Sequence, residues 1–188
     1  LGAEQVADAR VSSYADAGEA ESAGSMAFDD EGVAAHRVPL MEEGKVAGYL
    51  SSRETAARVG LERSSGSVRS SGWFSAPRVR TSNISLAPHD GGSLEDLVKG
   101  VDSGVLLSNP RLVTLHGGGH AFFVVAEAGW RIENGERKHM VKRPCYAGES
   151  LEFWKRCTGI GNDESWRSYG TLARAKGGEG SALPVGAG

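Results

Sequence analysis

The sequence predicts an α+β fold that is mainly antiparallel β, with a barrel-like sheet of hairpins and about three short helices. Glycine supplies 27 of the 188 residues, roughly twice the usual ~7%. Such a content disfavours long helices, because each glycine inside a helix costs about 1 kcal/mol. Hairpin signals recur, and the clearest is Asn134-Gly135 between two alternating segments. Strands do not alternate with long helices, so a parallel sheet is not expected.

The first half of the chain predicts one hairpin and one helix. Residues 5–14 fit either a strand or a short helix. Residues 38–50 predict a hairpin, because a Glu-Gly pair provides a tight turn between two apolar segments. Ser52 is suited to cap a helix over residues 53–59, and Gly60 to end it.

The middle of the chain is first polar and then alternates between apolar and polar residues. Residues 61–76 are rich in Ser, Gly and Arg and are expected to form a long loop. Residues 79–86 predict a strand. Ser93 begins a second helix, with Asp96 in the capping-box position.

The second half adds strands and a third helix. Ser150 is expected to cap a helix over residues 151–157. Residues 170–188 are Gly- and Ala-rich and predict a strand and a loop. The expected strands between the second and third helices are residues 105–107, 112–115, 121–126 and the two arms around Asn134-Gly135.

Charge and cysteine content exclude several classes of protein. The net charge is -3, with 21 basic and 24 acidic side chains, which argues against a general nucleic-acid-binding surface. No apolar run approaches the ~18 residues of a membrane helix, and no signal-peptide pattern opens the chain. Cys145 and Cys157 are too few for a disulfide framework or a four-cysteine zinc site. A single disulfide, a nucleophile or ligand role, and simple apolar packing stay open for them.

Three stretches could carry a function, and each also has a purely structural interpretation. His116 and His120 enclose three glycines, which suits a metal site, a lipase-type oxyanion loop or a simple strand connection. The acidic turn at residues 29–32 suits a cation or a turn cap. The arginines of residues 63–80, with Trp73 and Phe74, suit phosphates, single-stranded bases, a peptide carboxylate or a solvated loop. Residue chemistry alone therefore indicates only an α+β domain that binds a peptide or a partner.

The order of several motifs is more specific than any of them alone. Together, over residues 3–186, they resemble the C-terminal domain of the TldD/PmbA family of metallopeptidases and their partner subunits. The motifs are residues 28–33, the 40–49 hairpin, the loop ending at Gly72, residues 77–86, residues 93–104, residues 130–136, residues 152–154 and Gly161.

The resemblance implies a mainly antiparallel, barrel-like domain that follows an N-terminal α/β domain. It implies homo- or heterodimers that act on unfolded or modified peptides in the cytoplasm, often one catalytic subunit with one non-catalytic. Zinc in the catalytic subunit is held by two histidines of an H-E-x-x-x-H helix and by a cysteine near the C-terminal end, and the glutamate activates water.

This sequence departs from the catalytic pattern at two points. It contains no H-E-x-x-x-H, and the cysteine position falls in residues 173–178, where Arg174 or Lys176 stands. Neither side chain can replace a thiolate, and the two cysteines of the chain lie in other motifs. We therefore assign no catalytic and no metal-binding residue to this chain, although the parent family uses zinc.

The expected protein is a single domain over residues 1–188, truncated at both ends, from a TldD/PmbA-like metallopeptidase or its non-catalytic partner. The missing cysteine favours the non-catalytic subunit. The alternatives are an active zinc peptidase with another third ligand, and a peptide-binding or assembly module without catalysis. Arg80 and Asn83 are the expected substrate-groove residues, because their strand is polar where a structural strand could be apolar.

Overall fold

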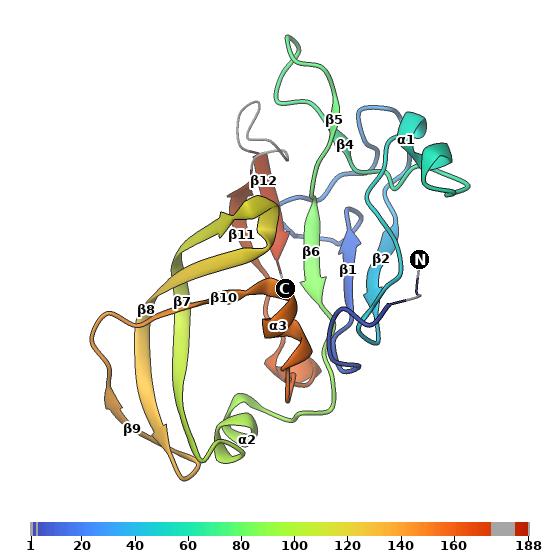
Figure 1. Cartoon of the computed structure of the whole chain (residues 1–188). Helices are drawn as coiled ribbons and strands as arrows, with labels where there is room; N and C mark the ends of the chain where they lie inside the picture. The colour runs from blue at the N-terminus through green and yellow to red at the C-terminus, as the bar shows by residue number, and fades with distance from the viewer. Residues whose placement is uncertain (1, 3, 174–182, 188) are drawn as a thin grey trace. The chain divides into compact units, whose positions relative to one another are not determined.

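The computed structural model describes residues 2, 4–173 and 183–187. The described chain divides into two compact units, each with its own sheet (Figure 1). Unit 1 comprises Leu1–Gln5, Val11–Ala87 and Arg167–Gly188, and unit 2 comprises Val6–Arg10 and Pro88–Trp166. The expectation of a single domain over 1–188 stays a prediction.

Unit 1 is built on a six-stranded sheet with the order β11-β12-β6-β1-β2-β3. Every neighbouring pair is antiparallel except β12 and β6, which run parallel. The strands are β1 (Ser13–Asp16), β2 (Arg37–Glu42), β3 (Lys45–Val46), β6 (Asn83–Leu86), β11 (Tyr169–Ala173) and β12 (Leu183–Ala187). The same unit contains α1 (Arg53–Arg58) and the short ladder of β4 (Val68–Arg69) with β5 (Arg78–Val79).

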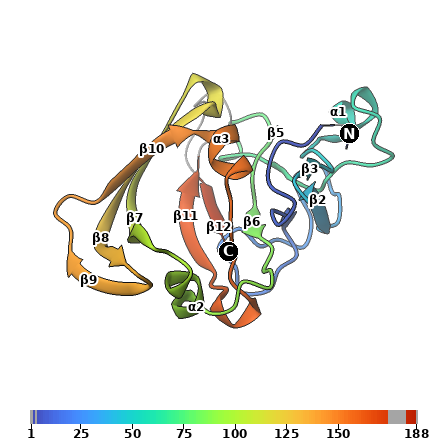
Figure 2. The same cartoon turned by 60° about the horizontal axis from the view of Figure 1, so that its bottom comes forward.

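Unit 2 is built around one long hairpin. β7 (Ser103–His116) pairs with β8 (Ala121–Glu133), and β8 pairs on its other side with β9 (Glu136–Met140) and β10 (Cys145–Glu149). Figure 2 shows β10, β8 and β7 side by side, and all pairs are antiparallel. The helices are α2 (Leu94–Lys99) and α3 (Ser150–Lys155), with 3-10 turns η1 (Gly117–Gly119) and η2 (Asp163–Ser165).

The α+β class with mainly antiparallel pairing and three short α-helices is confirmed. The expected barrel-like closure is not seen among the described residues, because the larger sheet ends at β11 on one side and β3 on the other. None of the described helices is long and apolar enough to cross a membrane.

Local signals explain why the short helices begin where they do. The Ser52 hydroxyl accepts a hydrogen bond from the Thr55 N–H, and the Ser93 hydroxyl accepts one from the Asp96 N–H, so both predicted caps are confirmed. The third cap prediction was wrong. Glu149 occupies the N-cap of α3, and Ser150 instead donates its hydroxyl proton to the Gly119 carbonyl oxygen at 2.6 Å.

The observed strands differ from the predicted ones in two regions. Residues 105–107 and 112–115 belong to the single strand β7, which continues through Asn109-Pro110 with a register shift. The predicted loop over residues 61–76 contains β4, and the predicted strand over 79–86 divides into β5 and β6. Partners distant in the sequence decide these boundaries, so local pattern could not reveal them.

Both units have small apolar cores, but their polar interiors differ. Unit 1 buries Val11, Ala15, Ala17, Ala56 and Val68, and unit 2 buries Ala7, Val98, Ala126, Ile132 and Ile160. Among the described residues, the buried polar side chains all lie in unit 1: Asp29, Ser51, Ser64, Ser65, Ser67, Arg80, Ser82, Asn83 and Ser85. Several of these side chains are hydrogen-bonded within unit 1, whereas the buried hydroxyls of Ser82 and Ser85 have no hydrogen-bond partner among the described residues.

Candidate functional site

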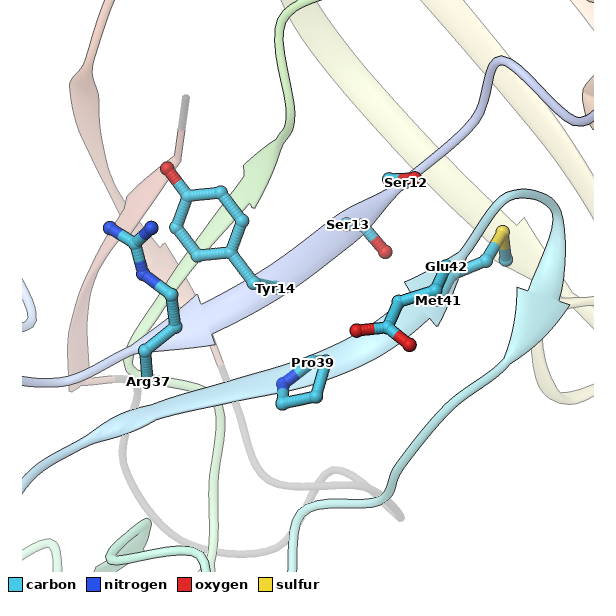
Figure 3. A pocket seen from close by; sticks show the side chains of 7 residues that line it. All are labelled: Ser12, Ser13, Tyr14, Arg37, Pro39, Met41 and Glu42. Atoms are coloured by element: carbon cyan, nitrogen blue, oxygen red, sulfur yellow. The ribbon is translucent and has the colours of Figure 1, made fainter. Parts of the chain in front are cut away.

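A cavity of about 350 Å³ lies over β1 and β2, where the two strands pair (Figure 3). This volume is in the range of small-ligand sites, ~300–1,000 Å³. The register sets Tyr14 opposite Pro39 and Asp16 opposite Arg37, so side chains from both strands share one surface. The lining residues are Ser12, Ser13, Tyr14, Arg37, Pro39, Met41 and Glu42.

Arg37 is held in place at one end of this cavity. Its Nε donates a hydrogen bond to Asp16 Oδ2 at 3.0 Å, and its guanidinium carbon lies 4.1 Å from the centre of the Tyr14 ring. The hydrogen bond to Asp16 is the main cause that raises the pKa of Arg37. The guanidinium is therefore a permanent cation in a defined position.

Glu42 lies at the other end of β2, beside Met41 and Pro39. Within the described part of the chain, the Glu42 carboxylate has no hydrogen-bond or ion-pair partner. The terminal nitrogens of Arg37 likewise have no acceptor among the described residues. The cavity thus presents a cation and a carboxylate, and apolar Pro39 and Met41 are also part of its lining.

Asn83, a predicted groove residue, is 1% exposed at the start of β6. Its Nδ2 donates to the Asp16 carbonyl oxygen at 2.8 Å and to Ser25 Oγ at 3.1 Å. Its Oδ1 accepts from the Gly24 N–H at 2.8 Å. Asn83 therefore supports the backbone of Asp16, the residue that anchors Arg37.

Arg80, the other predicted groove residue, is 5% exposed. Its Nε donates to the Arg69 carbonyl oxygen at 3.1 Å, and its backbone N–H donates to the Ser67 carbonyl oxygen at 2.9 Å. Arg80 thus braces β4. The structure does not bring Arg80 or Asn83 into the lining of the β1–β2 cavity, and their contact with a substrate stays a prediction.

The acidic turn at residues 29–32 serves the protein's own backbone. Asp29, 5% exposed, accepts hydrogen bonds from the N–H groups of Glu31, Val33 and Val68 at 2.9–3.1 Å. Glu31 accepts the N–H of Arg53 at 2.7 Å, at the start of α1. These contacts support the turn-cap interpretation over a cation site.

The arginine-rich segment forms the β4–β5 ladder and its tip. Arg69 lies opposite Arg78 in the ladder. Burial, followed by the charge of Arg80, lowers the pKa of Arg69. At the tip, the Trp73 side chain is 98% exposed and meets Phe74 edge-on, with ring centres 5.9 Å apart.

The described residues do not fit a zinc centre. A catalytic zinc site needs three protein ligands, and no group of three or more His, Cys, Asp or Glu side chains gathers anywhere in the described ranges. His116 and His120 flank η1 without a third ligand there. Arg174 and Lys176 lie outside the described residues.

Both cysteines are free thiols, so the disulfide alternative is not supported. Cys145 is exposed on β10. Cys157 is half-buried, with its Sγ 3.6 Å from the Gly159 carbonyl oxygen. It lines a cavity of about 510 Å³ in unit 2 together with Glu149 and Glu152.

The sequence did not point to the β1–β2 cavity. Tyr14 and Asp16 are two residues apart, so on a strand they share one face. This spacing could have indicated the site only if residues 13–16 had been predicted as a strand. Their partner Arg37 lies 21 residues beyond Asp16. That pairing required the sheet register.

Comparison with known proteins gives a consistent answer. Residues 2–182 match the family model described as the PmbA/TldA metallopeptidase C-terminal domain. A metalloprotease of Methanothermobacter thermautotrophicus is 38% identical over 140 residues, covering 74% of this chain and 30% of that protein. A zinc metalloprotease TldD homolog of Saccharolobus solfataricus is 27% identical, covering 66% of this chain and 27% of that protein.

The fold has a counterpart among solved structures. TldE of Thermococcus kodakarensis superposes with a TM-score of 0.72 at 21% identity, covering 98% of this chain and 39% of that chain. The present chain spans about a third of the length of the curated relatives it matches. Because the family match covers nearly all of the sequence and the fold agrees, this chain belongs to the PmbA/TldA metallopeptidase C-terminal domain family.

Proposed function

We propose that this chain is the peptide-handling C-terminal part of a TldD/PmbA-type peptidase assembly and works as its non-catalytic subunit. The match over residues 2–182 carries the assignment to this type of assembly. The non-catalytic role is supported by Arg174 and Lys176 in the stretch where the family's cysteine is expected. The open, bipolar cavity over β1 and β2 is where we place peptide binding.

The proposed substrates are unfolded or modified peptides in the cytoplasm, and the proposed partner is a homologous subunit. The relatives' names support the pairing idea, since one is called a TldD homolog and another TldE. Arg80 supports β4 and Asn83 supports the end of β1 by hydrogen bonds to backbone carbonyl oxygens. We also propose that both side chains contact the bound peptide.

Metal analysis and a peptide assay test the proposal together. The full-length protein that contains this sequence is assayed for zinc content, for binding of a reduced, unfolded polypeptide, and for its cleavage with and without a chelator. We expect binding without stoichiometric zinc and without cleavage. Stoichiometric zinc with cleavage lost on chelation would overturn the non-catalytic assignment, and absence of binding would overturn peptide handling.

Two other candidates are separated by these measurements together with a test for complex formation with a homologous subunit. An active zinc peptidase is favoured by the relative named a zinc metalloprotease, and it requires zinc and chelator-sensitive cleavage. An assembly module without peptide binding would form a stable complex with a homologous subunit while leaving the unfolded polypeptide unbound.

A further inference from the structure

The strongest unassigned feature is the pair of opposite charges at the two ends of the β1–β2 cavity (Figure 3). Arg37 and Glu42 lie at the two ends of the six-residue strand β2. At ~3.3 Å per residue, their Cα atoms are roughly 17 Å apart. An extended peptide of three to five residues spans about 10–18 Å, given ~3.3–3.6 Å per residue. The Glu42 side chain extends from the end of β2 back toward Pro39 (Figure 3), so the distance that a ligand must span is shorter than the distance between the two Cα atoms.

The cationic end is organised to receive a carboxylate. Asp16, whose side chain is only 14% exposed, occupies Nε of Arg37. The terminal nitrogens remain available, since no acceptor for them is found among the described residues. The Tyr14 ring, stacked on the guanidinium, limits its movement. The Arg37 side chain is 60% exposed, so a ligand can reach it, and its planar guanidinium can bind a carboxylate through two hydrogen bonds.

The opposite end is organised to receive a cation. Glu42 lines the cavity with a carboxylate that has no partner in the described ranges. The Ser12 hydroxyl accepts the Glu43 N–H at 3.0 Å, which ties the end of β2 to the residue preceding β1. In the same lining, Pro39 and Met41 provide apolar surface for uncharged side chains.

We propose that this cavity binds short peptides by both free ends, with the C-terminal carboxylate at Arg37 and the N-terminal ammonium at Glu42. The inference rests on the proposed peptide-handling function and narrows it to peptides of about three to five residues. Such ligands have the size of peptidase products, so the cavity would retain or select fragments rather than intact chains.

Blocked and unblocked peptides test both contacts. Binding of a tetrapeptide of alanine and leucine to the purified chain is measured by calorimetry in four forms: both ends free, C-terminally amidated, N-terminally acetylated, and doubly blocked. We expect each block to weaken binding by about tenfold or more, as loss of a charge-assisted hydrogen bond does. Equal affinities for the four forms would overturn the inference.

Two variants assign each end of the peptide to its residue. Arg37→Gln should bind the free and the amidated peptide equally, and Glu42→Gln should bind the free and the acetylated peptide equally. Arg58→Gln and Glu54→Gln, which alter an exposed ion pair on α1, should keep the full preference for free ends. Glu42→Gln disturbs no contact within the described chain, so it tests the site even if Arg37→Gln alters folding.

The inference and the proposed function fail differently. If a long unfolded polypeptide binds but the tetrapeptide binds independently of its ends, peptide handling stands and end recognition is wrong. If neither ligand binds, both are wrong.

Discussion

The side-chain amide of Asn83 donates a hydrogen bond of 2.8 Å to the backbone carbonyl of Asp16, and this bond joins β6 to the end of β1. Asp16 in turn holds the Arg37 guanidinium at 3.0 Å. A buried amide on one strand therefore supports the charged end of a cavity formed by two others. Asp16 therefore connects the buried Asn83 to the cation of the proposed peptide site.

Replacing Asn83 should destabilise the chain measurably. Asn83→Ala removes three hydrogen bonds at a position that is 1% exposed. It leaves the Gly24 N–H and the Asp16 carbonyl without this partner, and we expect a loss of about 2–3 kcal/mol in the free energy of unfolding. Urea denaturation measures it. Asn162→Ala, which removes a single half-buried cap of η2, should cost about 1 kcal/mol, and similar losses for both would contradict the role of Asn83.

Gly24 should tolerate no side chain. A Cβ there would lie 2.7 Å from Asn83 Oδ1 and 2.7 Å from the carbonyl group of Ser82. Gly24→Ala should therefore cost about 1–3 kcal/mol by overpacking, read from the thermal midpoint. The control is Gly100→Ala at the end of α2, where the nearest atom lies at 3.5 Å and φ is −76°. A Gly24→Ala protein as stable as Gly100→Ala would contradict the close packing.

Asp96 should make stability depend on pH in the acid range. Hydrogen bonds from Ser93, and then from Lys99, lower the pKa of Asp96 from 3.8 to about 2. The ionised carboxylate is favoured in the folded state, so its stabilising contribution is complete above pH 3.8 and is lost as the pH falls through about 2.

The experiment compares thermal midpoints of the parent chain and Asp96→Asn from pH 7 down to pH 2. We expect the difference to be largest near neutrality and to shrink below pH 3.8. The control is Asn162→Ala, which removes a helix cap whose amide does not titrate, and its effect on the midpoint should not follow this trend. A constant difference for Asp96→Asn across the range would contradict the capping-box role.

Trp73 should dominate collisional quenching of fluorescence. Its side chain is 98% exposed, whereas Trp130, Trp154 and Trp166 are partly buried. Trp73→Phe should remove most of the iodide-quenchable emission and change the unfolding free energy by less than about 0.5 kcal/mol. Trp166→Phe serves as the matched control and should leave the quenchable fraction in place. Unchanged quenching in Trp73→Phe would show that the tip is covered in solution.

Much of the local structure could be predicted because its causes are local. Ser52 and Ser93 cap their helices through contacts three residues away. Asn134-Gly135 and Glu43-Gly44 adopt positive φ at both turn positions, which is the backbone of the type I′ turns that favour two-residue hairpins. The order of such motifs was also sufficient to indicate the family.

The candidate site depended on contacts that local pattern does not specify. The strand containing Asn83 was predicted, but its neighbours were not: β6 lies between β1 and β12, and the β12 pairing is parallel. The same polar strand that suggested a groove proved buried, with Asn83 hydrogen-bonded to the Gly24 and Asp16 backbones. The sequence alone does not distinguish a polar side chain that faces a ligand from one that is hydrogen-bonded to a buried peptide group.

The sequence was enough to predict the starts of α1 and α2, the tight turns and the family, because each depends on neighbours a few positions apart or on the order of motifs. The start of α3 was predicted wrongly, since Ser150 bonds to Gly119, 31 residues away. The cavity over β1 and β2 arose only on folding. Tyr14, Asp16 and Arg37 become one unit because antiparallel pairing brings residues 21 positions apart into contact. The free energy of that contact depends on sheet register and burial, which are properties of the assembled sheet.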